Sequence, residues 1–519
     1  MGDLDNPIKV SIGQFYGIEI NDFAVTVAKT ALWISEAQAM QETENIVHMS
    51  LDFLPLKSYA NIVEGNALRL DWADVIPPDK CDYIMGNPPF VANAGRTANE
   101  DSHSKAMLDN EQREDRKKIF GASGGVLDYV ACWHKVASEY MQGTKIKAAF
   151  VSTNSICQGQ QVAPLWKPLF EKGIKINFAH QTFKWVSESG KAATVFVVIV
   201  GFSYQANKEA YLFSNGQANI VPHINGYLVN ADDVFIEKRK TPLCDVPEMI
   251  RGSQPTDNGN LILSFEECEQ LTHKEPTAKT FIRPFMMGKD FIDRKPRFCL
   301  WLVNANPSEL KKCPSVLKRI DAVKEFRLKS TKAATRKKAE TPMLFDEIHE
   351  CDSYFVAIPK VSSGARKYIP MEYLPPEIIP GDKLFMTQRA TLYHFGVLTS
   401  NVHMAWQNAV CSKYGPSYSY SNTLAYNNFP WPEATDTQKA TIEKTAQGIL
   451  DARAKFPNSS LADLYDETTM PPELRKAHQA NDRAVMAAYG MDVKATSEAS
   501  CVAELMRRYR ELTEKERSK

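Results

Sequence analysis

The chain has 519 residues, of which 44% are hydrophobic and 24% charged, a composition that excludes a wholly disordered protein and predicts roughly two to four domains. Its 62 Lys and Arg residues equal its 62 Asp and Glu residues, so any polyanion binding must come from local clusters of charge. The ten cysteines form no CxxC pair, so neither a zinc ribbon nor a disulfide framework is predicted. Because the apolar run at 192–202 is too short to span a membrane and no secretory signal is visible, we expect a cytoplasmic protein.

The first 200 residues alternate between strand-like and helix-like patterns. Asn21 or Asp22 can cap a helix after the first strand, since apolar residues at helical spacing follow. The third strand must end at Pro88, because prolines do not continue a central strand. Later apolar runs are typical of buried parallel strands. Strands are expected at 15–20, 61–64, 82–85, 148–151 and 195–200. The alternation predicts a doubly wound α/β sheet.

The rest of the chain divides into three segments. Residues 206–260 are rich in turns and are predicted to be a linker or domain junction. Residues 261–432 contain many aromatic residues and prolines, and we expect a separate α+β domain there. Residues 433–519 are predicted to be helical, and the last helix carries an apolar stripe that should pack against the rest of the protein. The stripe consists of Val502, Leu505, Tyr509 and Leu512.

The most informative stretch is Asn87-Pro88-Pro89-Phe90, directly after the third expected strand. Sheets of this class bind ligands at the carboxyl ends of their strands. An amide side chain and the carbonyl of a stiff proline turn offer two acceptors for one exocyclic amino group, and the neighbouring ring can stack on a planar base. A base inside a duplex must be flipped out to reach such a pocket. The alternative interpretation is a plain proline turn.

This stretch resembles motif IV of the amino-group DNA methyltransferases, in its adenine-N6 form, and other motifs of that group stand around it in the right order. Gly17-Ile18-Glu19-Ile20 resembles motif II, whose acidic residue accepts hydrogen bonds from the ribose of S-adenosylmethionine. Gly65-Asn66-Ala67-Leu68 resembles motif III, which contacts the cofactor adenine, although Asn66 replaces the usual Asp. Residues 127–130 and 150–155 resemble motifs V and VI.

The resemblance assigns roles to these residues. It implies that Asn87 and the Pro88 carbonyl hold the target amino group and that Phe90 stacks on the flipped adenine, with Pro89 completing the catalytic set. It also implies that S-adenosylmethionine is the cofactor. The residues expected at the cofactor are Glu19, Ile20, Asn66, Ala67 and Asn87.

From about residue 11 to about residue 490 the chain is similar to the methyltransferase and recognition portions of the MmeI-like, single-chain Type IIL restriction–modification enzymes. The resemblance implies a Rossmann-like methyltransferase sheet, here a partial domain at residues 1–205. It further implies an α+β target-recognition domain and a C-terminal helical region. Family members carry a glycine-rich cofactor loop, motif I, on a central strand upstream of motif II.

This chain begins too close to motif II to contain that loop, and no nuclease site is apparent. We therefore expect the motif II and motif IV strands to have unpaired edges. The expectation is a C-terminal part of a larger enzyme, whose upstream-encoded partner supplies motif I and a nuclease. Whether it is a split gene product, a truncation or a subunit is left open.

Basic residues are concentrated between 311 and 338, which suits phosphate contacts, although a solvated helical face is the alternative. A loop from 360 to 367 mixes hydroxyl groups, cations and glycine, and a segment from 413 to 420 falls where the resembled family varies its base-reading residues. The expected DNA-binding residues are Lys329, Lys332, Arg336, Lys360, Ser362, Ser363, Arg366, Lys367, Ser417 and Ser419. Lone histidines such as His134 and His403 are expected to be structural, and no metal site is assigned.

The function expected from these observations is methylation of adenine N6 in double-stranded DNA, within a restriction–modification or related defence system. The first alternative is a DNA-recognition fragment or specificity subunit without catalysis. The second is an RNA or protein-glutamine methyltransferase, since these also use Asn-Pro-Pro-aromatic turns.

Overall fold

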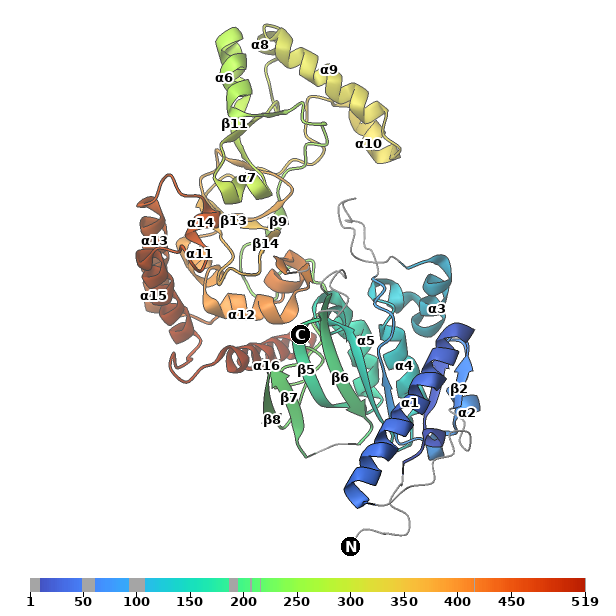
Figure 1. The fold of residues 1–519 in the computed structure, drawn as a ribbon. Coiled ribbons are helices and arrows are strands. Elements are labelled where there is room, and N and C mark those ends of the chain that lie inside the picture. Colours follow the sequence, from blue (N-terminus) through green and yellow to red (C-terminus); the bar gives the residue numbers. More distant parts are fainter. Residues whose placement is uncertain are drawn as a thin grey trace. The chain divides into compact units, whose positions relative to one another are not determined.

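The computed structural model describes residues 10–48, 61–92, 108–185, 195–205, 208–214, 216–414 and 416–518. The chain divides into two compact units (Figure 1). Unit 1 consists of residues 1–156 and 164–224, and unit 2 of residues 157–163 and 225–519. The expected linker at 206–260 is therefore shared between the units instead of forming a separate connection. Among the described residues, no helix is long and apolar enough to cross a bilayer.

The larger sheet of unit 1 has six strands in the order β3-β4-β6-β5-β7-β8. The strands are β3 (Tyr83–Gly86), β4 (Lys147–Thr153), β5 (Lys175–Trp185), β6 (Val195–Ser203), β7 (Ala210–Ser214) and β8 (Gln217–Val221). As expected, β4 is parallel to a neighbour, β3. The prediction was wrong for β6, which is antiparallel to both β4 and β5. Apolar composition reports burial on both faces but not direction. Residues 192–194, which begin the same apolar run, lie outside the described residues.

Two helices of unit 1 form its aromatic core with the sheet. The helices of this unit are α1 (Asp22–Val47), α2 (Trp72–Val75), α3 (Asn110–Phe120), α4 (Ala131–Tyr140) and α5 (Val162–Glu171). His134 of α4 is fully buried, with its ring stacked on Phe202 and in contact with Phe150 and Trp166 of α5. Burial lowers the pKa of His134 to about 4, so the residue is a neutral core group, as the sequence predicts.

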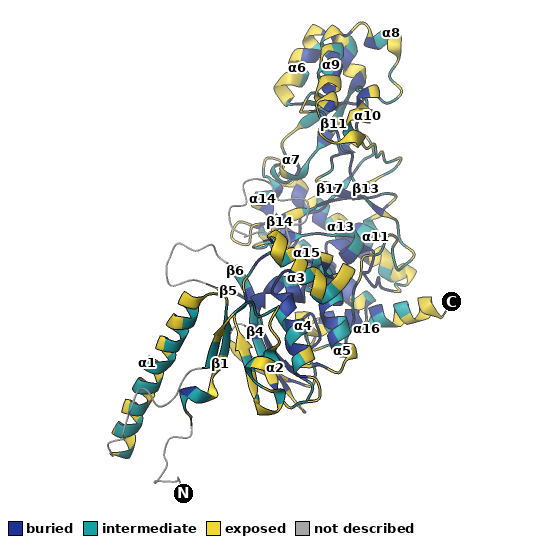
Figure 2. Cartoon of the chain, turned by 90° about the vertical axis from the view of Figure 1, so that its right-hand side faces the viewer, coloured by how far each residue is buried: buried dark blue, intermediate teal, exposed yellow. Residues whose placement is uncertain are grey.

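A second, two-stranded sheet in unit 1 is formed by β1 (Tyr16–Glu19) and β2 (Asn61–Glu64), which are parallel. The Asn21 side chain caps α1 by accepting a hydrogen bond from the Ala24 amide at 2.8 Å. Helix α1 has no buried residue (Figure 2). Phe23 on this helix is 75% exposed. Within the described residues, β1 pairs only with β2, and β3 pairs only with β4. The sequence predicts unpaired edges on these two strands, and in the described part of the chain each has one edge without a partner strand.

Unit 2 contains three small sheets, ordered β15-β13-β17-β9, β10-β12-β11-β16 and β14-β19-β18. The strands are β9 (Met249–Arg251), β10 (Ile262–Leu263), β11 (Ile282–Met286), β12 (Arg297–Leu300), β13 (Phe355–Pro359), β14 (Val361–Ser363), β15 (Glu372–Leu374), β16 (Ile379–Pro380), β17 (Leu384–Thr387), β18 (Lys413–Tyr414) and β19 (Ser417–Ser419). Strand β9 lies within the expected linker but is part of the first of these sheets, where it pairs with β17.

The helices of unit 2 pack around these sheets and then form the C-terminal region. They are α6 (Phe265–Lys274), α7 (Gly288–Asp293), α8 (Pro307–Leu310), α9 (Pro314–Leu328), α10 (Ala333–Lys337), α11 (Leu392–Leu398), α12 (Asn401–Val410), α13 (Asp436–Ala454), α14 (Leu461–Leu464), α15 (Pro472–Ala488) and α16 (Glu498–Arg517). The stripe predicted on the last helix is largely buried, with Val502, Leu505 and Tyr509 in the core. Tyr509 contacts Trp406 of α12 at a ring distance of 5.9 Å, so α16 packs on the protein as expected.

Candidate active site and nucleic-acid interface

Motifs II and III lie side by side at the carboxyl ends of β1 and β2. The register pairs Glu19 with Glu64, and the Gly65 amide donates to the Glu19 carbonyl at 2.7 Å. Glu19 is half-buried and Ile20 is exposed. The loop after β2, residues 65–70 (the 65–70 loop), thus begins directly beside the acidic end of β1. Both predicted cofactor motifs are at one end of this parallel pair, where ligands bind in α/β sheets.

The turn at residues 87–90 (the 87–90 turn) follows the last residue of β3. Asn87 and Pro89 are exposed, Phe90 is half-buried and Pro88 is buried. The Val91 amide donates to the Pro89 carbonyl at 3.0 Å, and the Val91 carbonyl accepts from the Tyr129 amide at 3.1 Å. The proline ring at 88 is therefore anchored in the protein, while the Asn87 amide is presented to solvent at the tip of the strand.

Asp115 of α3 connects the two motif regions. This carboxylate is 2% exposed. It accepts hydrogen bonds from Arg69 Nε at 2.8 Å, from the Tyr129 hydroxyl at 2.9 Å and from Asn66 Nδ2 at 3.2 Å. Burial opposes ionisation, but the bonds from Arg69, Tyr129 and Asn66 outweigh it and hold the pKa of Asp115 below its ordinary value. The charge of Arg69 compensates the buried carboxylate.

An apolar cluster reinforces the same connection. Leu68 of the 65–70 loop packs in one cluster with Val91, at the end of the 87–90 turn, and with Tyr129. The segments that resemble motifs III, IV and V are thus connected within unit 1.

The contacts of Asn66 give a structural reason for an asparagine at this position. Its Nδ2 donates to Asp115, and its Oδ1 accepts from the Leu68 amide at 2.9 Å. An aspartate here would have no donor for Asp115 and would face it as a second carboxylate. Sequence reasoning missed Asp115 and Arg69, because the charged pattern of α3 is typical of a solvated helix. The available signal was the asparagine at position 66, because its side chain has an N–H donor that a carboxylate can accept.

Four of the predicted DNA-binding residues come together on the small sheet β14-β19-β18. The register pairs Ser363 with Ser417, and Ser362 and Ser419 lie in the same two strands. Ser363 is exposed, and Ser417 and Ser419 are half-buried. Ser362 is buried. These residues come from segments more than 50 positions apart. Ser363, Ser417 and Ser419 form a polar patch on one face of the sheet, while Ser362 lies on its other, buried face.

The predicted cations around this sheet differ in environment. Arg366 is half-buried and donates to the Ser362 hydroxyl at 3.2 Å, so it supports the sheet. Lys360 is half-buried, with Nζ 4.9 Å from the centroid of the Phe385 ring. Burial and the nearby charge of Arg251 lower the pKa of Lys360 to about 8.

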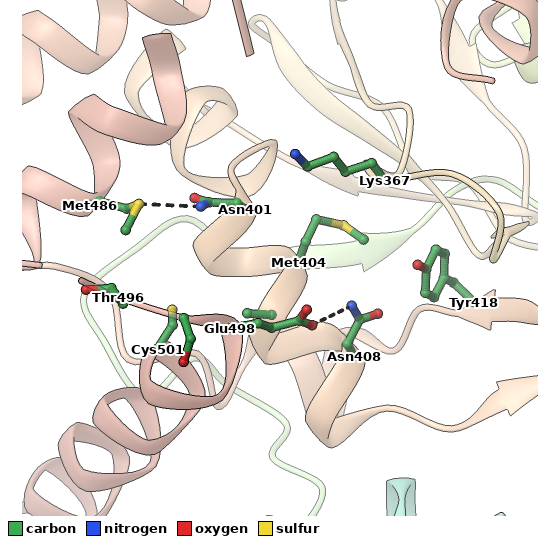
Figure 3. Close-up of a pocket in the computed structure, with 11 residues that line it drawn as sticks. Lys367, Asn401, Met404, Asn408, Tyr418, Met486, Thr496, Glu498 and Cys501 are labelled. Carbon is green, nitrogen blue, oxygen red and sulfur yellow. Dashed lines mark hydrogen bonds between the residues drawn. The ribbon is translucent and has the colours of Figure 1, made fainter. Parts of the chain in front are cut away.

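Lys367 is exposed and lines a pocket of about 330 Å³ (Figure 3). Helices α12 and α16 contribute most of the other lining residues. Asn408 donates to Glu498 at 3.1 Å in this pocket, and the pair of side chains is visible in the close-up.

The basic segment at 311–338 is not part of this polar patch. It forms α9 and α10, which belong with the sheet β10-β12-β11-β16. Lys329 and Lys332 are exposed, as phosphate contacts require. Arg336 is exposed but donates to the carbonyls of Ser330 and Thr331, at 2.8 and 2.9 Å. The sequence predicted that these three cations are exposed, and they are. Only the fold shows that they belong with a different sheet from that of Ser363 and Ser417.

Arg327 is the exception within the basic segment. It is fully buried and donates to five backbone carbonyls. The acceptors are Thr256, Lys338, Thr341, Pro255 and Leu344. This guanidinium holds the loops around α9 together, and it is not available for phosphate.

Comparison with known proteins shows the family of this chain. Residues 2–214 match the family model described as the MmeI DNA-methyltransferase domain, residues 230–433 the MmeI target recognition domain, and residues 434–516 the MmeI C-terminal domain. The chain belongs to the MmeI family. It is 37% identical over 512 residues to DNA methyltransferase A of Bacillus subtilis (strain 168), a match that covers 98% of this chain.

A solved structure of an MmeI-family protein has the same fold. It is that of the Type IIL restriction-modification enzyme MmeI in complex with DNA, with a TM-score of 0.81 and 38% identity. The match covers 99% of this chain and 68% of that chain. This chain spans 57% of the length of the Bacillus subtilis protein. Both relatives are therefore considerably longer than the sequence described above.

Proposed function

We propose that this MmeI-family chain transfers a methyl group from S-adenosylmethionine to the N6 atom of adenine in duplex DNA, within a restriction–modification system. The observation that carries the proposal is the exposed Asn87 amide beside the anchored Pro88, linked through Val91, Tyr129 and Asp115 to the 65–70 loop. The names of the two longer relatives, a DNA methyltransferase and an enzyme solved with DNA, support it.

The target base is held by three groups of the 87–90 turn. The Asn87 Oδ1 and the Pro88 carbonyl each accept a hydrogen bond from one N–H of the adenine amino group, and Phe90 stacks on the flipped ring. Holding the amino group in this way aims its nitrogen lone pair at the methyl group. The rate enhancement then comes from positioning, and after the transfer the methylated nitrogen gives up its extra proton to solvent water.

The residues present fit the cofactor in part. S-adenosylmethionine supplies an electrophilic methyl group when bound. The half-buried Glu19 carboxylate, at the end of β1 and next to Ile20, is a suitable acceptor for ribose hydroxyl groups. Asn66 uses one N–H of its Nδ2 and one lone pair of its Oδ1 within the protein, so it retains one N–H and one lone pair for the cofactor adenine. Ala67, the next residue of the same loop, is the other residue that we expect to lie beside the cofactor.

A further polypeptide segment, carrying motif I, completes the cofactor site in this proposal. In the part of the chain that the structure describes, β1 and β3 each have an edge without a partner strand, which supports it. So does the exposure of large apolar side chains on β3, where Tyr83 is 70% and Met85 81% exposed. A central strand should not leave such side chains in solvent. We propose that an upstream-encoded polypeptide provides this strand and the nuclease.

The decisive experiment is methylation by the chain reconstituted with its upstream-encoded partner, read by long-read detection of N6-methyladenine in duplex DNA. Asn87→Ala should abolish methylation while duplex affinity stays within about twofold, because the amide acts on the flipped base and not on the phosphate backbone. Asn458→Ala, at an exposed asparagine of unit 2, is the matched control. Undiminished methylation by Asn87→Ala would remove the assignment.

The free strand edges also support a second candidate, a DNA-recognition component without catalysis. In that case the chain binds duplex DNA, but no partner restores methylation. Structured RNA in the same gel-shift series separates both candidates from an RNA methyltransferase, which would bind RNA more tightly than duplex DNA.

A further inference from the structure

We infer that Asp115 is a positioning residue that sets the 87–90 turn against the 65–70 loop, and so aligns the target base with the methyl donor. This inference rests on the proposed function. Asp115 lies on α3, between the segments that resemble motifs IV and V, and belongs to neither of them.

The carboxylate is a junction between three separate segments. Its Oδ1 accepts from Arg69 Nε at 2.8 Å. Its Oδ2 accepts from the Tyr129 hydroxyl at 2.9 Å, from Asn66 Nδ2 at 3.2 Å and from Arg69 Nη2 at 3.4 Å. Asn66 and Arg69 are in the 65–70 loop. The third donor residue, Tyr129, also donates its backbone amide to the Val91 carbonyl. One side chain thus determines the spacing between the two loops.

Only an ionised carboxylate satisfies all these donors. An asparagine at 115 has one acceptor oxygen and one NH2 group. If its oxygen faced Arg69, its NH2 would face the Asn66 NH2 group, although the Tyr129 hydroxyl could turn to accept from it. If it were turned around, the NH2 would face Arg69. Either orientation sets donor against donor in a buried position, so one of the two loops must move.

Movement of Tyr129 is transmitted to the turn through two backbone bonds. The Tyr129 amide holds the Val91 carbonyl, and the Val91 amide holds the Pro89 carbonyl. Leu68 packs in the same cluster as Val91, so the cofactor side of the site moves with it. A displacement of about 1 Å between reacting groups can lower a rate about 100-fold, because transfer depends on alignment.

The test compares Asp115→Asn and Tyr129→Phe with a matched control, Glu111→Gln. Glu111 is on the same helix and contacts the same Arg69 at 3.2 Å, but its side chain is 78% exposed. In the reconstituted enzyme, with rates normalised to active sites, Asp115→Asn should lower kcat about 10- to 100-fold. It should also raise KM for S-adenosylmethionine several-fold, while KM for duplex DNA stays within about twofold. Tyr129→Phe should show a smaller effect in the same direction, and Glu111→Gln none.

A second measurement does not depend on catalysis. Hydrogen exchange of the full chain by itself should show the Val91 and Tyr129 amides exchanging at least about tenfold faster in Asp115→Asn and in Tyr129→Phe, but not in Glu111→Gln. A purely structural Asp115 would lower stability, leave normalised kcat and KM unchanged, and speed exchange of these two amides no more than that of other amides of unit 1; that result would overturn the inference. If the wild-type reconstituted enzyme does not methylate DNA, the proposed function fails, and the exchange rates still decide whether Asp115 sets the turn.

Discussion

The Asn66 amide of the loop after β2 donates to the Asp115 carboxylate of α3 at 3.2 Å, across 49 positions of the chain. The contact gives a structural reason for the asparagine at position 66, where the resembled motif III usually has aspartate. A donor is needed at position 66 because the acceptor at position 115 is buried and ionised.

Asn66→Asp should destabilise unit 1 by about 1–3 kcal/mol at neutral pH, because a hydrogen bond to a buried charge is replaced by a second carboxylate. The loss should shrink at acidic pH, where one of the two carboxyl groups can take up a proton. Urea unfolding of the single variant and of the swapped pair Asn66→Asp/Asp115→Asn tests this. The swapped pair should recover part of the loss, and an equal or greater loss in the pair would contradict the proposed pairing.

Two cations of the basic segment should respond in opposite ways. Arg327→Met removes the donors of five buried carbonyls and should cost at least about 3 kcal/mol of unfolding free energy in unit 2. Lys329→Ala should leave stability nearly unchanged, since this side chain is 80% exposed. If Lys329 contacts phosphate, its loss should reduce the slope of log affinity against log salt by about 1. Denaturation curves and salt titrations of duplex binding distinguish the two roles.

Duplex affinity should fall as pH rises through about 8, because Lys360 loses its charge near that pH. The charged form exists below the pKa and is the form that contacts phosphate, so the loss occurs on the alkaline side. From pH 7 to pH 9 we expect about a three- to tenfold decrease. Lys360→Arg should remove this decrease, because a guanidinium stays charged. Lys329→Met is the control that should keep it. Identical pH profiles for wild type and Lys360→Arg would exclude Lys360 from the interface.

Mild acid should destabilise unit 1 through His134. The pKa of this histidine in the folded chain, about 4, is below the ordinary value of 6.5, so the unfolded chain takes up the proton first as pH falls. Its contribution to stability is complete above pH 6.5 and is lost progressively between about 6.5 and 4. Going from pH 7.5 to 5.5 should cost about 1 kcal/mol through this residue alone. His134→Phe keeps the aromatic packing and should show a correspondingly smaller loss in unfolding experiments at the two pH values.

Much of this protein could be predicted from its local patterns. Strand ends are set by proline and glycine, so the position of the Asn87 turn after β3 followed from the sequence, as did the helix capped by Asn21. The motif order predicted the methyltransferase and recognition regions that the MmeI family models cover. The sequence also predicted unpaired edges on the motif II and motif IV strands, and among the described residues β1 pairs only with β2 and β3 only with β4.

Long-range contacts were decided only by the tertiary structure. The charge pattern that makes α3 look solvated gives no indication that Asp115 is buried, because its donors come from two other segments. Composition likewise could not separate Arg327 from Lys329, two positions apart, since one side chain turns into the core and the other into solvent. The sequence by itself determined which chemical groups stand at the strand ends. The fold determined which of them are buried, paired and in contact, because those properties depend on neighbours that are distant along the chain.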